Sequence, residues 1–302
     1  MNRSRFGRKF NTSKMINTVL IGIILLISGV FVFIERYGGI GGPRLPASGT
    51  AEVHFIDVGQ GDCALIRTGT ASILIDSGEY EQYSTVSRYL KRQGITSLDY
   101  IVVSHPHTDH MGCMYRIVDS FGARALIMPD VKELEPDIPL YRRLMDSVGR
   151  QGIPVMYAEA GTSLELGENC RLEILSPTAQ YEDLNNMSVT VRFVYGNVRF
   201  LFTGDIERDA ESDILESGQD ISADVLKVPH HGSGTSSTKI FVQAVSPRYA
   251  VFSVGAANDY GHPHSNIVEL YRKLGASILR TDMNGNIVFT TDGNALTLAA
   301  DR

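Results

Sequence analysis

The sequence predicts an α/β protein, built as a four-layer αββα sandwich that is preceded by one transmembrane helix. Three observations support this fold class. Short apolar strands alternate with helical stretches through residues 51–302, β structure dominates the middle of that region, and residues 15–34 contain no charged side chain. Two β-rich halves bury most apolar surface when their sheets pack face to face and helices cover the outer sides. The chain has no Gly-x-Gly-x-x-Gly and no Walker loop, which argues against nucleotide-binding folds.

The N-terminal segment has the charge pattern of a membrane anchor. Residues 1–14 hold five Arg or Lys side chains and no acid, and 20 uncharged residues follow at 15–34. As a helix this stretch is about 30 Å long, which matches the hydrocarbon thickness of a bilayer. The positive-inside rule keeps the basic tail cytoplasmic, so we expect a single-pass protein of the cell membrane whose remaining residues are extracytoplasmic. A cleaved signal peptide is the alternative, although its apolar core is usually shorter.

Residues 35–50 are rich in Gly and Pro and predict a linker, so the folded domain is expected at residues 51–302, long enough for one large core. The first 36 residues carry a net charge of +5, and because the whole chain carries −6, the rest carries −11. A domain this acidic attracts long polyanions only where positive charge is locally concentrated. Three cysteines, odd in number and sparse, indicate buried thiols rather than a disulfide framework.

Strands and helices alternate in the first half of the domain. Apolar and β-branched runs between glycine turns predict strands, and periodic apolar positions predict helices, the first of them capped by Ser84. The expected strands are 53–58, 64–67, 72–76, 100–103, 125–128 and 155–157, and the expected helices are 84–93, 111–121 and 140–150.

The second half begins with β structure and ends with alternating helices and strands. Gly196-Asn197 lies between two apolar runs and predicts a tight hairpin. The expected strands are 164–166, 170–175, 189–195, 198–202, 224–228, 249–253 and two closing strands, and the expected helices are 207–216, 239–245 and 266–274.

The segment His105-Pro-His107-Thr-Asp109-His110 concentrates metal ligands directly after the apolar strand at 100–103. In an extended segment, side chains two residues apart point to the same side, so His105 and His107 can converge on one ion. Asp109 and His110 lie where the chain turns into the next helix, so a second ion can be bound. Of eight histidines, seven fall within 105–110, 230–231 and 262–264, which is not the distribution of scattered surface histidines.

Residues 232–238 form a loop of Gly, Ser and Thr before a predicted helix. Exposed N–H groups and the helix dipole would favour an anionic phosphate there, and Ser233 is the candidate contact because it lies close to His230. An ordinary capping loop is the alternative explanation.

Seven motifs, in the right order, resemble those of the metallo-β-lactamase superfamily, and more narrowly the extracytoplasmic hydrolase domain of the ComEC competence DNA-uptake family. The resemblance covers residues 52–290. Full-length members of that family carry many membrane spans, whereas this sequence predicts one. Channel function therefore does not carry over to this chain. The resembling segments are residues 54–62, 73–78, 104–112, 186–188, 201–205, 224–233 and 260–264.

This resemblance implies a dinuclear metallohydrolase. Its first ion would be held by His105 and His107 and its second by Asp109 and His110, with Asp205 bridging the two. For the remaining ligand His230 is preferred to its neighbour His231, although one sequence leaves that choice open. Asp76 is expected to support the histidine loop rather than bind metal, and the residues expected to act in catalysis are Asp109, Asp205 and His262.

One superfamily ligand has no counterpart here, because no histidine lies between residues 110 and 205. Asn186 and Ser188 occupy its place beside the first ion, as is typical of the ComEC-like branch. An amide oxygen suits manganese better than a thiolate would, so the expected cofactors are two divalent metal ions, Zn or Mn.

The combined expectation is a membrane-anchored, extracytoplasmic phosphodiesterase that acts on single-stranded DNA. His262 is expected to face substrate, where its imidazole would bind a phosphate oxygen or help the leaving group. Cations such as Lys227 would neutralise phosphates, and Tyr260 would offer a stacking face. Two alternatives stay open: a cell-surface phosphoester hydrolase of the phosphorylcholine-esterase kind, and a non-catalytic module of DNA-uptake machinery. The sequence indicates no particular protein partner.

Overall fold

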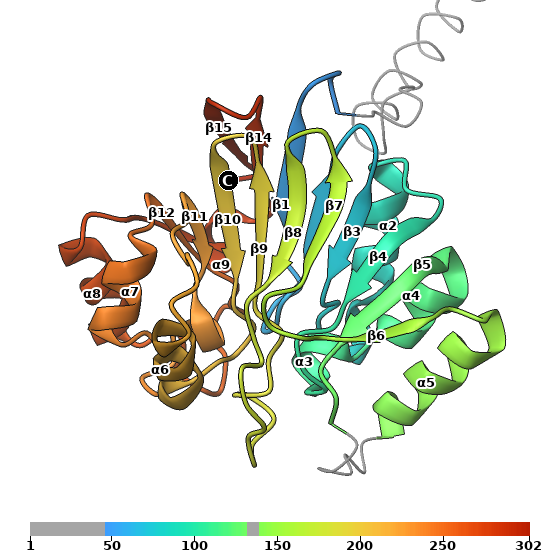
Figure 1. Cartoon of the computed structure of the whole chain (residues 1–302), viewed down its shortest axis with the longest axis horizontal. Helices are drawn as coiled ribbons and strands as arrows, with labels where there is room; N and C mark the ends of the chain where they lie inside the picture. Colours follow the sequence, from blue (N-terminus) through green and yellow to red (C-terminus); the bar gives the residue numbers. More distant parts are fainter. Residues whose placement is uncertain (1–45, 132–138) are drawn as a thin grey trace, which may run out of the picture. The chain divides into compact units, whose positions relative to one another are not determined.

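Two β-sheets face each other in the computed structural model, which describes residues 46–131 and 139–302 (Figure 1). Within those residues the first sheet has eight strands, in the order β15-β14-β1-β2-β3-β4-β5-β6, and the second has seven, in the order β13-β12-β11-β10-β9-β8-β7. The strands are β1 (Ala51–Phe55), β2 (Ala64–Arg67), β3 (Ser72–Ile75), β4 (Leu98–Val102), β5 (Ala123–Met128), β6 (Val155–Tyr157), β7 (Ser163–Gly167), β8 (Cys170–Ile174), β9 (Val191–Tyr195), β10 (Val198–Phe202), β11 (Val225–Lys227), β12 (Tyr249–Phe252), β13 (Ser277–Arg280), β14 (Ile287–Thr291) and β15 (Leu296–Ala300).

Helices cover the outer face of each sheet, which gives the four layers that the sequence predicts. The first sheet is covered by α2 (Tyr83–Arg92), α4 (Met114–Phe121) and α5 (Pro139–Gln151), and the second by α6 (Arg208–Glu216), α7 (Lys239–Val245) and α8 (Ser265–Lys273). The remaining helices are short: η1 (Tyr80–Gln82), α3 (Thr108–Met111), η3 (Pro229–Gly232) and α9 (Thr281–Asn284).

Three apolar layers hold the sandwich together, and strand alternation creates them. On β3, Ile73 and Ile75 point into the core between the sheets, while Leu74 points the other way, under the helices. Successive side chains of a strand face opposite sides, so an apolar run can fill two layers at once. The same holds in the second sheet, where Phe200 packs between the sheets and Leu201 packs under the helices.

Parallel strands bring the site-bearing loops to one edge of the sandwich. β3, β4, β5 and β6 run parallel in the first sheet, and β10, β11, β12 and β13 do so in the second. The carboxyl ends of parallel strands lie at the same edge, so the segments after β4, β10, β11 and β12 are close in space although about 150 residues separate the first from the last.

The helix expected at 111–121 begins earlier and is broken in two. α3 starts at Thr108, and α4 starts again at Met114 after Gly112 and Cys113. The backbone N–H of Ser77 donates to the carbonyl of His110 at 2.6 Å, and the Ser77 hydroxyl reaches the same oxygen at 3.2 Å. That carbonyl would otherwise continue the helix, so the contact explains the break.

Two further boundary expectations are wrong. Ser84 does not cap the helix expected at 84–93, because η1 leads directly into α2 and Gln82 occupies the N-cap position. Three strands and one short helix close the described chain instead of two strands, with β13 at the edge of the second sheet and β14 and β15 returning to the first. The hairpin at Gly196-Asn197 is confirmed, since Tyr195 pairs with Val198.

The three cysteines are buried free thiols, as expected. The membrane span expected at residues 15–34 lies outside the described residues. Among the helices that the structure does describe, none is long and apolar enough to cross a bilayer.

Candidate metal centre

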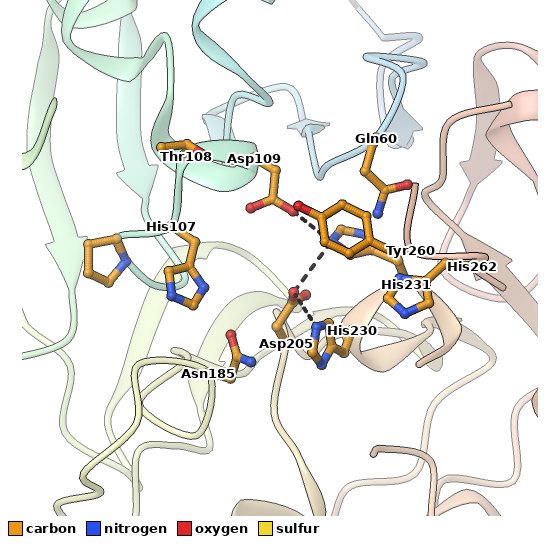
Figure 2. A pocket seen from close by; sticks show the side chains of 11 residues that line it. Gln60, His107, Thr108, Asp109, Asn185, Asp205, His230, His231, Tyr260 and His262 are labelled. Atoms are coloured by element: carbon orange, nitrogen blue, oxygen red, sulfur yellow. Dashed lines mark ion pairs between the residues drawn. The ribbon is translucent and has the colours of Figure 1, made fainter. Parts of the chain in front are cut away.

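A pocket of about 440 Å³ opens at the edge where the parallel strands end. Figure 2 shows Asp109, Asp205, His230 and His231 facing one another across it, with His107 and Asn185 at one side and His262, Tyr260 and Gln60 at the other. The three segments that carry the expected ligands therefore meet here, namely the loop after β4, the turn after β10 and the turn after β11, together with the loop after β12 that carries His262.

Four side chains form a tight cluster at the base of this pocket: Asp109, His110, Asp205 and His231. One ligand atom from each lies within 4.8 Å of every other. The Asp205 Oδ2 atom is 3.2 Å from Nε2 of His110 and 3.3 Å from Nε2 of His231. Asp205 is thus in contact with both imidazoles and belongs to the same cluster.

The cluster fits a metal ion because one buried nitrogen of each imidazole faces carboxylates without forming a hydrogen bond in the described chain. Nε2 of His110 and Nε2 of His231 are both buried and form no hydrogen bond among the described residues, and their near neighbours are the carboxylates of Asp205 and Asp109. Their other ring nitrogens are held, Nδ1 of His110 at 2.9 Å from Asp76 and Nδ1 of His231 at 2.8 Å from the carbonyl of Ser253. An imidazole fixed through one nitrogen presents the other to a cation, which is the usual arrangement around protein-bound metals.

His231, and not His230, belongs to this cluster. The His231 side chain is 2% exposed and its Nε2 atom is 3.2 Å from Asp109. The His230 side chain is 21% exposed; its Nδ1 atom is 3.2 Å from Glu207, and its Nε2 atom is 3.7 Å from Asp205, farther than that of His231. Both histidines have positive φ in η3, so the turn sends neighbouring side chains in different directions. The geometry therefore favours His231 over the expected His230 as the ligand.

Carboxylates set the ionisation of the clustered histidines. Burial alone would lower the pKa of His110, but the surrounding Asp205, Asp109 and Asp76 outweigh it and raise that pKa well above its usual value. For His231, burial and the Lys227 ammonium act downward, and Asp205 and Asp109 raise the pKa to about 9. Both histidines are therefore protonated in the metal-free protein at neutral pH. A bound cation would take the place of the added proton on each ring.

His105 and His107 form a second pair of ligand candidates. Nε2 of His105 lies 2.9 Å from Nδ1 of His107, as their spacing predicts. Burial holds the pKa of His105 well below its usual value, so its ring is neutral. The Ser188 hydroxyl is 3.3 Å from Nδ1 of His105 and accepts the N–H of Asp205 at 3.0 Å, which places Ser188 beside the ligands as expected.

Asn186 has a different role from the one expected beside the first ion. Its amide oxygen accepts the N–H groups of Glu207 at 2.9 Å and Ala210 at 3.2 Å, so it caps α6 and is not available to a metal. The preceding Asn185 lines the pocket instead. Its Nδ2 donates to Glu207 at 3.3 Å, and its Oδ1 is buried without a hydrogen-bond partner in the described chain. Sequence reasoning missed Asn185.

Asp76 supports the histidine loop in the way expected. Its carboxylate accepts the N–H of Ser104 at 2.8 Å, the hydroxyl of Ser104 at 2.7 Å and the contact from His110. The parallel pairing of β3 and β4 brings Asp76 to this position.

A buried ion pair between Asp62 and Lys227 lies behind the cluster and was not predicted. Nζ of Lys227 contacts Asp62, donates to the carbonyl of Gly204 at 3.0 Å, and lies 3.4 Å from Asp205. Burial would lower the pKa of Lys227, but the two carboxylates raise it, so the ammonium stays charged. Lys227 is 2% exposed and is therefore not a contact for substrate phosphates, contrary to expectation.

A glycine allows the Asp62 turn to reach the site. Gly61 has a φ of +127°, and a Cβ at this position would lie 2.2 Å from the carbonyl oxygen of Asp109. The N–H of Asp62 donates to that same oxygen at 3.1 Å. Only glycine permits this close approach, which explains one Gly of the Gly59-Gln-Gly61 turn.

The loop at 232–238 does not face the pocket as a phosphate site. Ser233 is buried, and the N–H groups of Ser237 and Thr238 donate to the carboxylate of Glu211 at 2.5 and 2.7 Å. A buried carboxylate from α6 thus occupies the N–H groups that a phosphate would need. The capping explanation fits this loop better than the substrate contact proposed for Ser233.

His262 does line the pocket, as expected. Asn258 fixes its backbone, accepting the N–H of His262 at 3.0 Å and donating to its carbonyl at 2.6 Å. Burial and the neighbouring histidines lower its pKa to about 4, so its ring is neutral at pH 7. Nδ1 of His262 is buried and forms no hydrogen bond among the described residues.

Comparison with protein families shows which family has this arrangement. A model described as the metallo-beta-lactamase superfamily matches residues 56–256, which include the histidine cluster, Asp205 and the His230-His231 pair. The chain belongs to the metallo-β-lactamase superfamily. Its fold and its clustered His and Asp side chains agree with membership, and superfamily members bind divalent metals, usually two.

Within the superfamily, the chain is similar to competence proteins. It is 29% identical over 261 residues to ComE operon protein 3 of Bacillus subtilis, a match that covers 80% of this chain and 33% of that protein. It is 32% identical over 253 residues to competence protein ComA of Neisseria gonorrhoeae, covering 82% and 33% respectively. Recombination protein 2 of Haemophilus influenzae is 28% identical over 272 residues, covering 88% and 31%. The chain thus spans about a third of the length of these relatives.

Two solved structures share the fold. Igni18, a metallo hydrolase from Ignicoccus hospitalis, superimposes with a TM-score of 0.54 at 15% identity, covering 79% of this chain and 98% of that one. The β-hydroxylase CmlA of Streptomyces venezuelae, described as a diiron enzyme, superimposes with a TM-score of 0.52 at 17% identity, covering 80% and 54%. At this identity the likeness concerns the fold alone.

Proposed function

We propose that this chain is a metal-dependent phosphodiesterase that cleaves single-stranded DNA on the outer side of the cell membrane, to which its N-terminal segment anchors it. The observation that carries the proposal is the convergence of the buried Nε2 atoms of His110 and His231 on the carboxylates of Asp109 and Asp205 at the base of an open pocket, with neither nitrogen in a hydrogen bond among the described residues. Buried polar atoms without partners are costly, and a cation is the partner that four such ligands suit.

We assign the ligands to two ion sites of unequal affinity. Asp109, His110 and His231 would hold one ion, His105, His107 and the Asn185 oxygen would hold the other, and Asp205 would contact both. Divalent ions at such a site supply Lewis acidity towards a phosphoryl oxygen and an activated water. The set of imidazole nitrogens and oxygens suits zinc or manganese, and the amide oxygen favours manganese at the second position.

The residues of the chain itself would position the substrate and handle its protons. The neutral His262 side chain lines the pocket wall opposite His107, where its imidazole would bind a phosphate oxygen or help the leaving group. Lys227 and Asp62 hold Asp205 in place from behind, since the ammonium lies between the two carboxylates.

The DNA substrate is supported by the competence relatives. Two of the three bear competence-operon or competence names, and the third is named a recombination protein. A phosphorylcholine substrate has less support, because a quaternary ammonium needs several aromatic rings around it. Among the described residues, Tyr260 is the only Tyr, Phe or Trp in the pocket wall.

The test uses the full chain, purified in a mild detergent and loaded with Mn²⁺ or Zn²⁺. Labelled single strands, labelled duplex and bis-p-nitrophenyl phosphate are the substrates, and Asp205→Ala is the control. We expect turnover of the diester and of single strands, less turnover of duplex, and none with Asp205→Ala. His262→Ala should raise KM or lower kcat while the bound metal stays unchanged.

Each contrary outcome indicates a different function for this chain. Turnover of bis-p-nitrophenyl phosphate without cleavage of either DNA would leave a surface phosphoesterase. Absence of all turnover in a fully metal-loaded chain would leave a non-catalytic module of DNA-uptake machinery.

A further inference from the structure

A stack of tyrosine and arginine side chains lies on the surface beside the pocket. It contains Tyr80, Tyr83, Tyr115, Arg116 and Arg143, and we name it the tyrosine–arginine stack. The Arg116 guanidinium is 3.9 Å from the ring centre of Tyr83 and 5.6 Å from that of Tyr80. The Tyr80 and Tyr115 rings stack at 6.5 Å and 19°, and the Arg143 guanidinium is 5.7 Å from the Tyr115 ring.

The two arginines of the stack are not neutralised. In the described parts of the chain, neither Arg116 nor Arg143 forms an ion pair with a carboxylate, whereas Arg67, Arg171, Arg192 and Arg280 all do. Arg143 is exposed and Tyr80 is 40% exposed, so the positively charged Arg143 side chain and part of the Tyr80 ring are open to solvent. In a domain that is acidic as a whole, this is a local concentration of positive charge and aromatic surface.

The stack is connected to the pocket through one hydrogen bond. Thr108, which lines the pocket beside His107, donates its hydroxyl to Glu79 at 3.4 Å, and Glu79 immediately precedes Tyr80. Gly112 allows the two segments to touch, because a Cβ there would lie 2.5 Å from the backbone nitrogen of Tyr80. Tyr80 therefore lies next to the pocket wall that His107 and Thr108 form.

We propose that the tyrosine–arginine stack binds the part of a single-stranded DNA that extends beyond the pocket on the side of His107 and Thr108. Tyrosine rings stack on unpaired bases of any sequence, and arginines bind the phosphates between them. Paired bases hide their faces, so the stack selects single strands over duplex. The inference rests on the proposed function and adds to it the surface that recognises the strand.

Acidic neighbours limit the size of this surface. Glu79 and Glu81 flank Tyr80 on the side of η1, so only the two arginines are expected to contact phosphates. Two such contacts to a single strand contribute a slope of about −1.4 to the dependence of log affinity on log salt concentration.

The test measures binding rather than turnover. The full chain in detergent is titrated, in the presence of EDTA to prevent cleavage, with a fluorescent 15-residue oligothymidylate, and anisotropy gives Kd. We expect Arg143→Glu and Tyr80→Ala each to weaken binding about tenfold, a typical effect of losing one stacking or phosphate contact. Arg272→Glu on α8, an exposed arginine with the same change of charge, should change Kd by less than about twofold. Tyr80→Trp and Arg143→Lys keep the ring and the charge and should bind like the parent.

Three results would overturn the proposal: parental affinity in both Arg143→Glu and Tyr80→Ala, an equal loss in Arg272→Glu, or binding of polyglutamate as tight as that of the oligonucleotide, which would indicate an acidic protein partner. Turnover of bis-p-nitrophenyl phosphate is measured on the same proteins. Parental turnover with unchanged DNA affinity refutes the stack and leaves the proposed function. Weakened DNA binding in variants of a chain that never turns over a diester supports the stack and refutes the phosphodiesterase.

Discussion

Asn185 and Asn186 are adjacent in sequence and have different roles. The Asn186 oxygen is used by the first N–H groups of α6, while the Asn185 oxygen is buried at the pocket wall without a partner in the described chain. An amide oxygen already engaged by two donors has little capacity for a cation, whereas an unengaged one gains from binding it. The Asn185 oxygen is therefore the better candidate for the place of the missing histidine.

Asn185→Ala is expected to lower the metal content of the chain from about two ions towards one, because it removes an oxygen from the weaker site. Asn185→His should retain both ions and shift preference from Mn²⁺ towards Zn²⁺. Metal analysis after dialysis against each ion measures both effects. Asn186→Ala is the matched control: it removes the α6 cap, so it should lower stability by about 1 kcal/mol and keep the metal content. Loss of metal from Asn186→Ala but not from Asn185→Ala would reverse the assignment.

The His230-His231 pair gives a second residue-level prediction. His231→Ala removes a buried nitrogen that contacts both Asp109 and Asp205, so we expect loss of bound metal and of turnover. His230→Ala removes a partly exposed ring that contacts Glu207 and lies farther from Asp205 than His231 does, so metal content should be retained. Isothermal titration with Zn²⁺ compares the two variants. If His230→Ala loses an ion while His231→Ala keeps both, the expectation from sequence was correct and the geometric preference is not.

At the scale of elements, α6 and the loop before α7 depend on one buried carboxylate. Glu211 on α6 accepts two backbone N–H groups of residues 237 and 238, and its side chain is fully buried. Burial raises the pKa of Glu211, while the hydrogen bonds from this loop lower it in part. The contact joins the turn that carries His230 and His231 to the helix that follows Asp205.

Glu211→Ala is expected to destabilise the fold by about 3 kcal/mol, because two buried N–H groups lose their acceptor. Chemical denaturation measures the difference. Glu216→Ala, at an exposed position of the same helix, should change stability by less than about 0.5 kcal/mol. Equal stability of the two variants would show that the loop finds other acceptors.

At the scale of the whole molecule, the metal site makes stability depend on pH. In the metal-free protein the pKa of His231 is raised from 6.5 to about 9 by Asp205 and Asp109 against the effect of burial. A raised pKa means that the protonated ring stabilises the folded state; this contribution is complete below pH 6.5 and is lost as pH rises through about 9. His262, with its pKa lowered to about 4, contributes the opposite dependence, present above pH 6.5 and lost as pH falls towards 4.

We therefore predict that the chain in EDTA melts at progressively lower temperature between pH 6.5 and pH 9, and that saturating Zn²⁺ abolishes this decline because the ion replaces the proton. Metal affinity should rise over the same range, since binding releases protons from the ligands. Thermal melts with and without metal at five pH values test both statements. A flat melting temperature in EDTA would contradict the ionisation assigned to His231.

The sequence by itself determined the fold class and the family, and it identified most of the candidate donor residues that the structure brings together. Binary patterning identifies strands and helices because their periods differ, and the six-residue cluster identifies metal chemistry because imidazole and carboxylate rarely concentrate without it. Element ends were less accurate: the break between α3 and α4 depends on Ser77, which is distant in sequence and donates to the His110 carbonyl.

Only the tertiary structure decided which neighbours face the site. His230 and His231, like Asn185 and Asn186, have the same chemistry and adjacent positions, so their roles depend on the left-handed turn of η3 and on the packing of α6. The buried Lys227 and Asp62 likewise became part of the site because β11 and the turn after β1 end at the same edge. Local pattern fixes what a residue can bind, and long-range packing fixes what it can reach.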